Sequence, residues 1–86
     1  KPRPLMQVQP TYPSSLKKSK ISGTVFLVFV VDEAGNVLDP QVEKSTHKEF
    51  SASALSCIKR WKFQPGYVDA EPVKVRVRAP MIFKVN

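Results

Sequence analysis

The sequence predicts a small α+β domain in which two helices, one of them short, pack on a three-stranded antiparallel sheet. Three observations predict this fold class. Residues 23–31 are β-branched and aromatic, residues 50–61 carry an apolar stripe at helical spacing, and residues 73–79 alternate valine with cations. The chain has 86 residues, of which 42% are apolar, so we expect one modest core that forms without disulfide bonds.

The beginning of the chain is rich in proline. Residues 1–13 hold four of the eight prolines and show no helical or strand periodicity, which predicts an extended proline-rich arm. The folded domain is then expected over residues 14–86, and residues 14–20 predict one or two turns of helix. The first residue is Lys1 rather than Met, from which we expect a processed product or an excised fragment, with any anchor or export signal upstream.

Residues 22–32 give the clearest strand pattern, and both faces of this strand are apolar. Such a strand is typically central in its sheet, and its second face needs a cover from an arm, a helix or a partner. Residues 32–36 predict a hairpin loop in which Gly35 can take a left-handed conformation. Residues 37–44 would return antiparallel, with Pro40 favouring an edge position or a bulge.

The second helix is predicted to begin at a capping box, with Thr46 as N-cap and Glu49 reaching back to it. Residues at spacings of four, four and three form its apolar stripe: Phe50, Ala54, Ile58 and Trp61. Pro65 and Gly66 prevent the helix from continuing, and a polar loop is expected after them.

The last predicted strand covers residues 73–79 and continues extended past Pro80 to residue 85. It can pair on the free side of the central strand, which gives the strand order 2-1-3 and leaves its own outer side exposed. Because Pro80 cannot donate a hydrogen bond, we expect a gap or bulge in the ladder there. This position would lie near the start of a segment that receives an added strand.

The residue inventory argues against an enzyme and against a bound cofactor or metal. There is one histidine and one cysteine, no metal-ligand spacing and no phosphate-cradling glycine loop. His47 is interpreted as a solvated residue of the first helical turn, and Cys57 as a small hydrophobic residue beside the stripe.

The formal charge of +7 favours an anionic partner. A basic nucleic-acid-binding module therefore remains an alternative. Nucleic acid is not the expected partner, because the aromatic residues fall at predicted core or turn positions rather than between the cations.

Three motifs in this order resemble the C-terminal domain of the TonB family. They are Gln9-x-x-Tyr12-Pro13, the strand and hairpin from Gly23 to Gly35, and Trp61-x-Phe63-x-Pro65-Gly66. The likeness covers about residues 9–85. It implies a periplasmic module of a protein anchored in the inner membrane of a Gram-negative bacterium.

The resemblance also implies partners. The ExbB–ExbD motor would act through an N-terminal anchor that these residues lack. The module would bind the TonB box, a short extended segment of outer-membrane transporters, and transmit energy for uptake of substrates such as iron siderophores. A TonB-like domain serving another envelope system is a further alternative. An exposed edge can also pair with its own copy, so a homodimer is possible.

Residue by residue, the resemblance assigns two contact regions. The first matches a Gln-Pro segment that contacts the transporter, and the second matches the strand that receives the TonB box. The expected partner-binding residues are Gln9, Pro10, Arg76, Arg78, Ala79, Pro80, Met81, Ile82, Phe83 and Lys84. We further expect Lys74, Arg76, Arg78 and Lys84 to favour acidic peptides.

Overall fold

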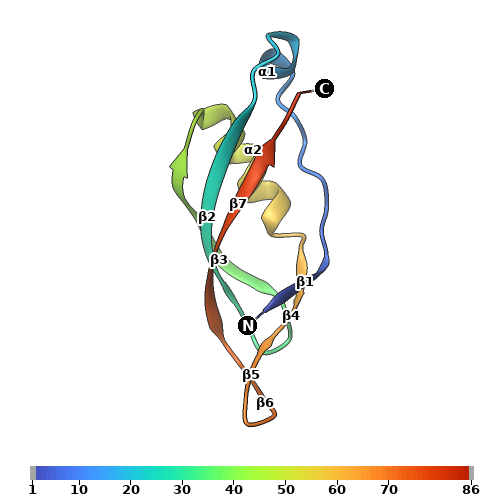
Figure 1. Cartoon of the computed structure of the whole chain (residues 1–86), viewed down its shortest axis with the longest axis vertical. Coiled ribbons are helices and arrows are strands. Elements are labelled where there is room, and N and C mark those ends of the chain that lie inside the picture. The colour runs from blue at the N-terminus through green and yellow to red at the C-terminus, as the bar shows by residue number, and fades with distance from the viewer. Residues whose placement is uncertain (1, 86) are drawn as a thin grey trace.

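The central element of the fold is strand β2 (Gly23–Val31), which pairs with a strand on each side. Its neighbours are β3 (Val37–Ser45) and β7 (Val75–Phe83), so the sheet has the order β3-β2-β7 and is antiparallel throughout. This confirms the predicted order 2-1-3. The structure is a computed structural model that describes residues 2–85, and it is elongated, with extents of 49 × 21 × 15 Å (Figure 1).

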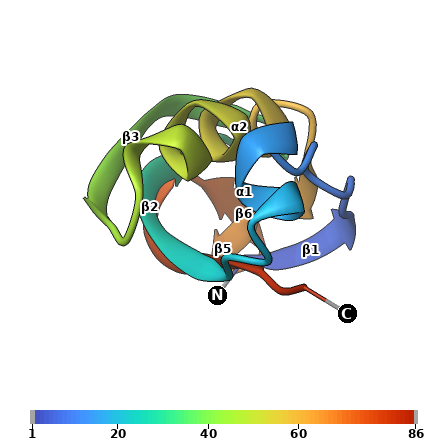
Figure 2. The same cartoon turned by 90° about the horizontal axis from the view of Figure 1, so that it is seen from above.

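Helix α2 (Lys48–Ile58) covers one face of this sheet, which gives the two-layer arrangement that the sequence predicts (Figure 2). Alternate residues of β2 point into the layer between them and are buried. The core consists mainly of Val25, Leu27, Phe29 and Val31 from β2, Phe50, Ala54, Cys57 and Ile58 from α2, and Met81 and Phe83 from β7. On the other face of β2, Phe26, Val28 and Val30 are half-buried, and the Arg78 guanidinium lies 5.1 Å from the Phe26 ring centre.

The two edges of the sheet differ in regularity. The β2–β3 register shifts twice, once past Glu43 and once past Asp39 and Pro40, where Asp39 has a positive φ of 48°. Pro40 therefore sits both on an edge strand and at a bulge, as the sequence predicted. The β2–β7 register runs without a shift from Gly23 opposite Phe83 to Val31 opposite Val75.

The predicted capping box at the start of α2 is wrong. The residue at the N-cap position is His47, and no side chain caps the helix there. Thr46 is instead the last pairing residue beyond β3: its N–H donates to the Thr24 carbonyl at 3.1 Å, and its hydroxyl accepts the Thr24 N–H at 3.1 Å. Strand pairing thus uses the hydroxyl that a cap would need.

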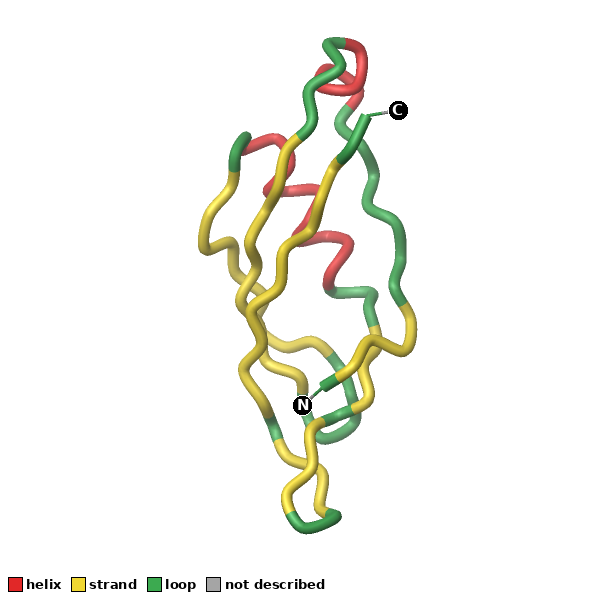
Figure 3. Tube along the Cα trace, viewed as in Figure 1, coloured by secondary structure: helices red, strands yellow, loops and turns green. Residues whose placement is uncertain are grey.

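The arm lies along α2 (Figure 3). Its strand β1 (Arg3–Met6) pairs antiparallel with β4 (Lys62–Gln64), a pairing that no periodicity in the arm indicates. The Val8 carbonyl then accepts hydrogen bonds from the Cys57 thiol at 2.9 Å and the Trp61 indole at 3.1 Å. The short helix α1 (Ser14–Lys18) follows and contributes Leu16 to the core.

The junction after α2 is held by the first hairpin. The Phe63 N–H donates to the Gly35 carbonyl at 2.9 Å, and the Phe63 ring lies 5.5 Å from the Phe29 ring. Gly35 has a φ of 85°, and a Cβ atom there would lie 2.0 Å from the Phe63 carbonyl oxygen. The glycine that the sequence assigned to the turn is therefore also required by the close approach of β4.

The segment predicted as a polar loop is a second hairpin, which is a correction to the sequence analysis. Strands β5 (Gly66–Val68) and β6 (Glu71–Val73) pair antiparallel, joined by Asp69 and Ala70. Both linking residues have positive φ, 50° and 68°, as a two-residue hairpin turn requires. The sequence offers Asp-Ala rather than the Asn-Gly or Asp-Gly that signals such a turn.

We predict that Gly35→Ala lowers the free energy of unfolding by about 2–4 kcal/mol, because the methyl group meets backbone in a conformation unfavourable to alanine. Ala70→Gly is the matched comparison, since it relieves a positive φ at an exposed turn. It should raise stability by about 0.5 kcal/mol after the entropy cost of glycine. Urea denaturation measures both, and a harmless Gly35→Ala would contradict the close approach of Phe63.

Candidate strand-accepting edge

The direction of the main-chain groups in β7 follows from the pairing of its neighbour. Thr24 exchanges hydrogen bonds with Thr46 and therefore faces the β3 side. Main-chain direction alternates along a strand, so Phe26, Val28 and Val30 also face β3, and the odd-numbered residues of β2 face β7. At the end of the ladder, the Val85 N–H donates to the Ser22 hydroxyl at 3.1 Å, which fits the same alternation.

The even-numbered residues of β7 consequently turn their N–H and C=O groups outward. Their partners across the ladder are Val30 for Arg76, Val28 for Arg78, Phe26 for Pro80 and Thr24 for Ile82, all of which face β3. Within residues 2–85 no strand pairs with the outer side of β7, and no backbone hydrogen bond joins it to the arm. This outer side of β7 is an open sheet edge, and we call it the β7 edge.

Pro80 lies within a regular ladder, so the expected bulge is absent from the β2–β7 pairing. Its nitrogen faces outward, so the missing N–H removes no hydrogen bond between β7 and β2. The gap that the sequence predicted is therefore on the open side of β7. The β7 edge offers the N–H groups of Arg76, Arg78 and Ile82 and an unbroken series of carbonyls.

The side chains expected to contact a partner divide between the two faces of β7. Met81 and Phe83 are buried in the core, and Ala79 is half-buried. Pro80, Ile82 and Lys84 are exposed, with Ile82 retaining 66% of its accessible surface. A strand added at the β7 edge would therefore meet the main chain of every residue but the side chains of only some.

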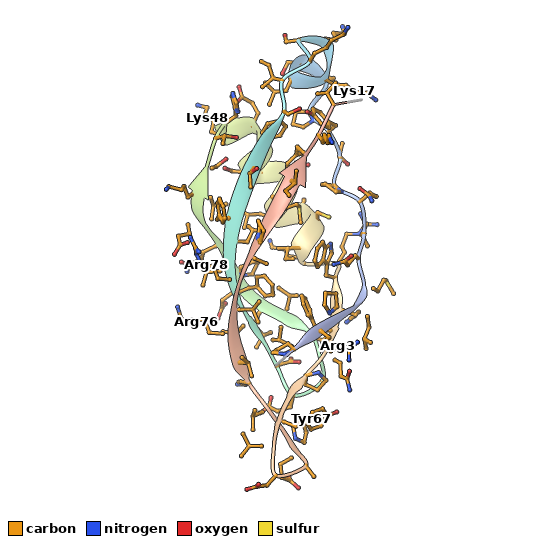
Figure 4. The ribbon with its side chains drawn as sticks, viewed as in Figure 1. Arg3, Lys17, Lys48, Tyr67, Arg76 and Arg78 are labelled. Carbon is orange, nitrogen blue, oxygen red and sulfur yellow. The ribbon has the colours of Figure 1, made fainter. Side chains whose placement is uncertain are left out.

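Arg76 and Arg78 lean across β2 toward β3 and away from the β7 edge (Figure 4). The Arg78 guanidinium pairs with the Glu43 carboxylate of β3. Arg76 lines a hollow with Asp39, Pro40 and Gln41. These two cations, which the sequence places on the receiving strand, are thus directed at neighbours within the sheet.

The Gln9–Pro10 segment lies on the arm. Gln9 is exposed and lines a groove between the arm and α2 with Ser53, Cys57 and Arg60, while Pro10 is half-buried. In the upper half of Figure 1, β2 and β7 lie between β3 and the arm. No hydrogen bond between the described residues joins these two expected contact regions.

Other kinds of site find little support in the described part of the chain. No cluster of three or more histidine, cysteine, aspartate or glutamate side chains occurs there that could hold a metal ion. None of the helices in residues 2–85 is long and apolar enough to cross a membrane. Within residues 2–85, no strand pairs with the outward main-chain groups of the β7 edge.

Comparison with known proteins agrees with this architecture. The fold defines a class of small α+β domains in which a helix covers one face of a three-stranded antiparallel sheet. A solution structure of the Pseudomonas aeruginosa TonB C-terminal domain matches it with a TM-score of 0.80. That match covers 98% of this chain and 86% of the other at 25% identity. The TonB2 protein from Vibrio anguillarum matches with a TM-score of 0.72 at 31% identity, covering 98% of this chain and 81% of the other.

The sequence comparisons then give the family. Residues 8–85 match the family described as Gram-negative bacterial TonB protein C-terminal, and the chain belongs to that family. It is 41% identical over 81 residues to Protein TonB of Vibrio cholerae and 33% identical over 78 residues to Protein TonB of Xanthomonas campestris. These matches cover 93% and 90% of this chain but 33% and 35% of the relatives, so the chain spans about a third of their length.

One charged feature near the β7 edge was not linked to it by the sequence analysis. Lys17 and Lys20 lie beside Lys84 in the fold, although more than sixty residues separate them in the chain. The sequence shows the lysines before the first strand as a group, but only the pairing of β2 with β7 reveals which strand end they approach.

We predict that the Arg78–Glu43 ion pair is weak enough to be exchanged for a partner's carboxylate. Both side chains are largely exposed, at 60% and 44%. A double-mutant cycle with Arg78→Gln and Glu43→Gln, read by urea denaturation, should give a coupling of about 0.2–1 kcal/mol. A coupling well above this range would mean that Arg78 is committed to the sheet.

Proposed function

We propose that this domain accepts the TonB box of outer-membrane transporters as an added strand at the β7 edge and transmits mechanical energy to it. The domain would be the periplasmic end of an energy transducer anchored in the inner membrane and driven by the ExbB–ExbD motor. Membership of the TonB C-terminal family supports this role, and the single structural observation that carries it is the open β7 edge.

The affinity expected from this edge is modest. Each outward N–H or C=O group of β7 can contribute a net ~0.5–1.5 kcal/mol when it pairs with an added strand. Several such bonds, less the cost of ordering a flexible peptide, give roughly micromolar or weaker binding. Backbone bonds depend little on side chains, so one domain could serve several transporters. Contacts from Gln9 and Pro10 would add to those of the strand.

The direction of load also suits this site. A strand added at the β7 edge runs parallel to the long axis of β7, so tension along the peptide loads all of the ladder bonds together. Peeling would load them one at a time. A ladder of low equilibrium stability can therefore resist force for a short time.

The nucleic-acid alternative has less support from the described residues. Among the large exposed hydrophobic side chains the aromatic one is Tyr67, which lies on the β5–β6 hairpin near Asp69 and Glu71. Stacking platforms are usually aromatic residues set among cations.

The proposal is tested by titrating the domain with peptides from transporter N-termini and following backbone amide shifts. Residues 76–84 should show the largest shifts. If peptides bind but the shifts lie elsewhere, for instance only around the α2 groove, strand addition at β7 is wrong.

Two proline changes sharpen this test. Pro80→Ala restores the missing outward donor and should tighten peptide binding by about two- to tenfold. Ile82→Pro removes an outward donor while leaving the β2–β7 bonds in place, and it should weaken binding by a similar factor. Met81→Pro is the matched control, because its N–H faces β2 and its loss should destabilise the fold itself. Equal affinity of the Ile82→Pro variant and the unaltered domain would contradict pairing at this edge.

A further inference from the structure

Three lysines from separate parts of the chain meet beyond the end of β7. Lys17 of α1, Lys20 and Lys84 line a hollow of about 350 Å³ together with Tyr12 and Val85. No aspartate or glutamate among the described residues lines it. We call it the lysine hollow. Three like charges with no acidic side chain among the described lining residues form a local site of positive potential.

Tyr12 fixes the position of this hollow relative to β7. Its ring makes edge contacts with the rings of Phe50 and Phe83, at centroid distances of 5.5 and 5.8 Å. Its hydroxyl donates to the carbonyl of Ile21, which directly follows Lys20. The end of β7 and the chain leaving α1 are therefore tied to one side chain, which holds the three lysines at the same end of the β7 edge.

Lys20 occupies a position that favours glycine. It has a φ of 56° just after the end of α1, where its N–H donates to the Lys17 carbonyl at 3.1 Å and the Ile21 N–H donates to Leu16 at 2.9 Å. Left-handed residues that end helices in this way are usually glycine. A lysine at this position is in a strained backbone conformation that glycine would relieve. This strain supports a functional role for the positive charge of Lys20.

The charges elsewhere along β7 make the lysine hollow distinctive. Arg78 is paired with Glu43, and Arg76 lines a hollow that also contains Asp39. Near the other end of β7, the β5–β6 hairpin carries Asp69 and Glu71. Among the described residues, the group of lysines whose lining contains no acidic residue thus lies at the Phe83 end of the β7 edge.

We propose that the lysine hollow binds carboxylates on an acidic peptide segment that flanks the strand added to β7. This inference rests on the proposed strand addition and deepens it. Because the hollow lies beyond Phe83, the acidic residues would sit just outside the paired segment. They would set both the register and the direction of the added strand, which nearly sequence-independent backbone bonds do not set by themselves.

The test compares peptides that share one extended segment taken from a transporter N-terminus. One carries two aspartates before the segment, one carries them after it, and one carries serines at both ends. The protein variant is Lys17→Gln/Lys20→Gln/Lys84→Gln. The control Lys44→Gln/Lys48→Gln/Lys59→Gln removes the same charge at residues of β3 and at the two ends of α2 that do not line the hollow, and Figure 4 shows Lys17 and Lys48 apart. Thermal unfolding confirms that both variants fold.

We expect one of the two acidic peptides to bind more tightly than the serine peptide. The hollow variant should bind that peptide with roughly fivefold lower affinity at low salt, and its affinity for the serine peptide should be unchanged. The control variant should lose much less affinity for the same acidic peptide. Added salt should remove the difference between the two variants. The position of the preferred aspartates then gives the direction of the strand.

Several results would overturn the proposal. They are equal binding of all three peptides, equal weakening by the hollow and control variants, and loss of binding to phosphatidylglycerol vesicles in the hollow variant with peptide binding unchanged. The last result would assign the lysines to a membrane surface. If no peptide shifts the amides of residues 76–84, strand addition fails and the proposal fails with it. If the serine peptide binds as tightly as the acidic peptides, only the proposed role of the lysine hollow is contradicted, and strand addition at β7 stands.

Discussion

The uninterrupted pairing of β2 with β7 is the constraint on which the rest of the structure depends. Because the register has no shift, every odd-numbered residue of β7 bonds to β2 and every even-numbered one faces outward. The same alternation sends Met81 and Phe83 into the core beneath α2 and leaves Ile82 exposed. One insertion in this ladder would reverse the faces beyond it, burying charge and turning the free main-chain groups inward.

The two borders of the sheet differ in regularity, and this difference favours the β7 border for the proposed strand addition. The β3 border is interrupted by bulges at Glu43 and at Asp39–Pro40, which twist the strand and break the spacing of its free groups. The β7 border keeps regular spacing, and one donor is missing from it, at Pro80. That one proline limits uncontrolled pairing without closing the border to a partner, since its carbonyl still accepts.

The sequence predicted the sheet, its strand order and the main helix because each depends on a local pattern with a clear period. It failed where a tertiary contact replaced a local one: Thr46 bonds to Thr24 instead of capping α2. It missed the β5–β6 hairpin because Ala70 takes a conformation that alanine seldom adopts. At the candidate site, the last strand and its exposed outer side were predictable from alternation. The inclination of Arg78 toward Glu43 and the grouping of Lys17 with Lys84 depend on contacts between distant segments.

The contacts of the arm suggest how a load would reach the receiving strand. The arm is held on α2 by the bonds to Val8 and by the Ser53 hydroxyl, which donates to the Thr11 carbonyl. One residue later the Tyr12 ring contacts Phe50 of α2 and Phe83 of β7. Tension entering from the N-terminal side would therefore meet the β1–β4 pairing first and α2 next. It would then pass through packed aromatic rings to the end of β7. A partner strand on the β7 edge would then be loaded against a strand anchored in the core, so its own ladder would yield before the domain unfolds.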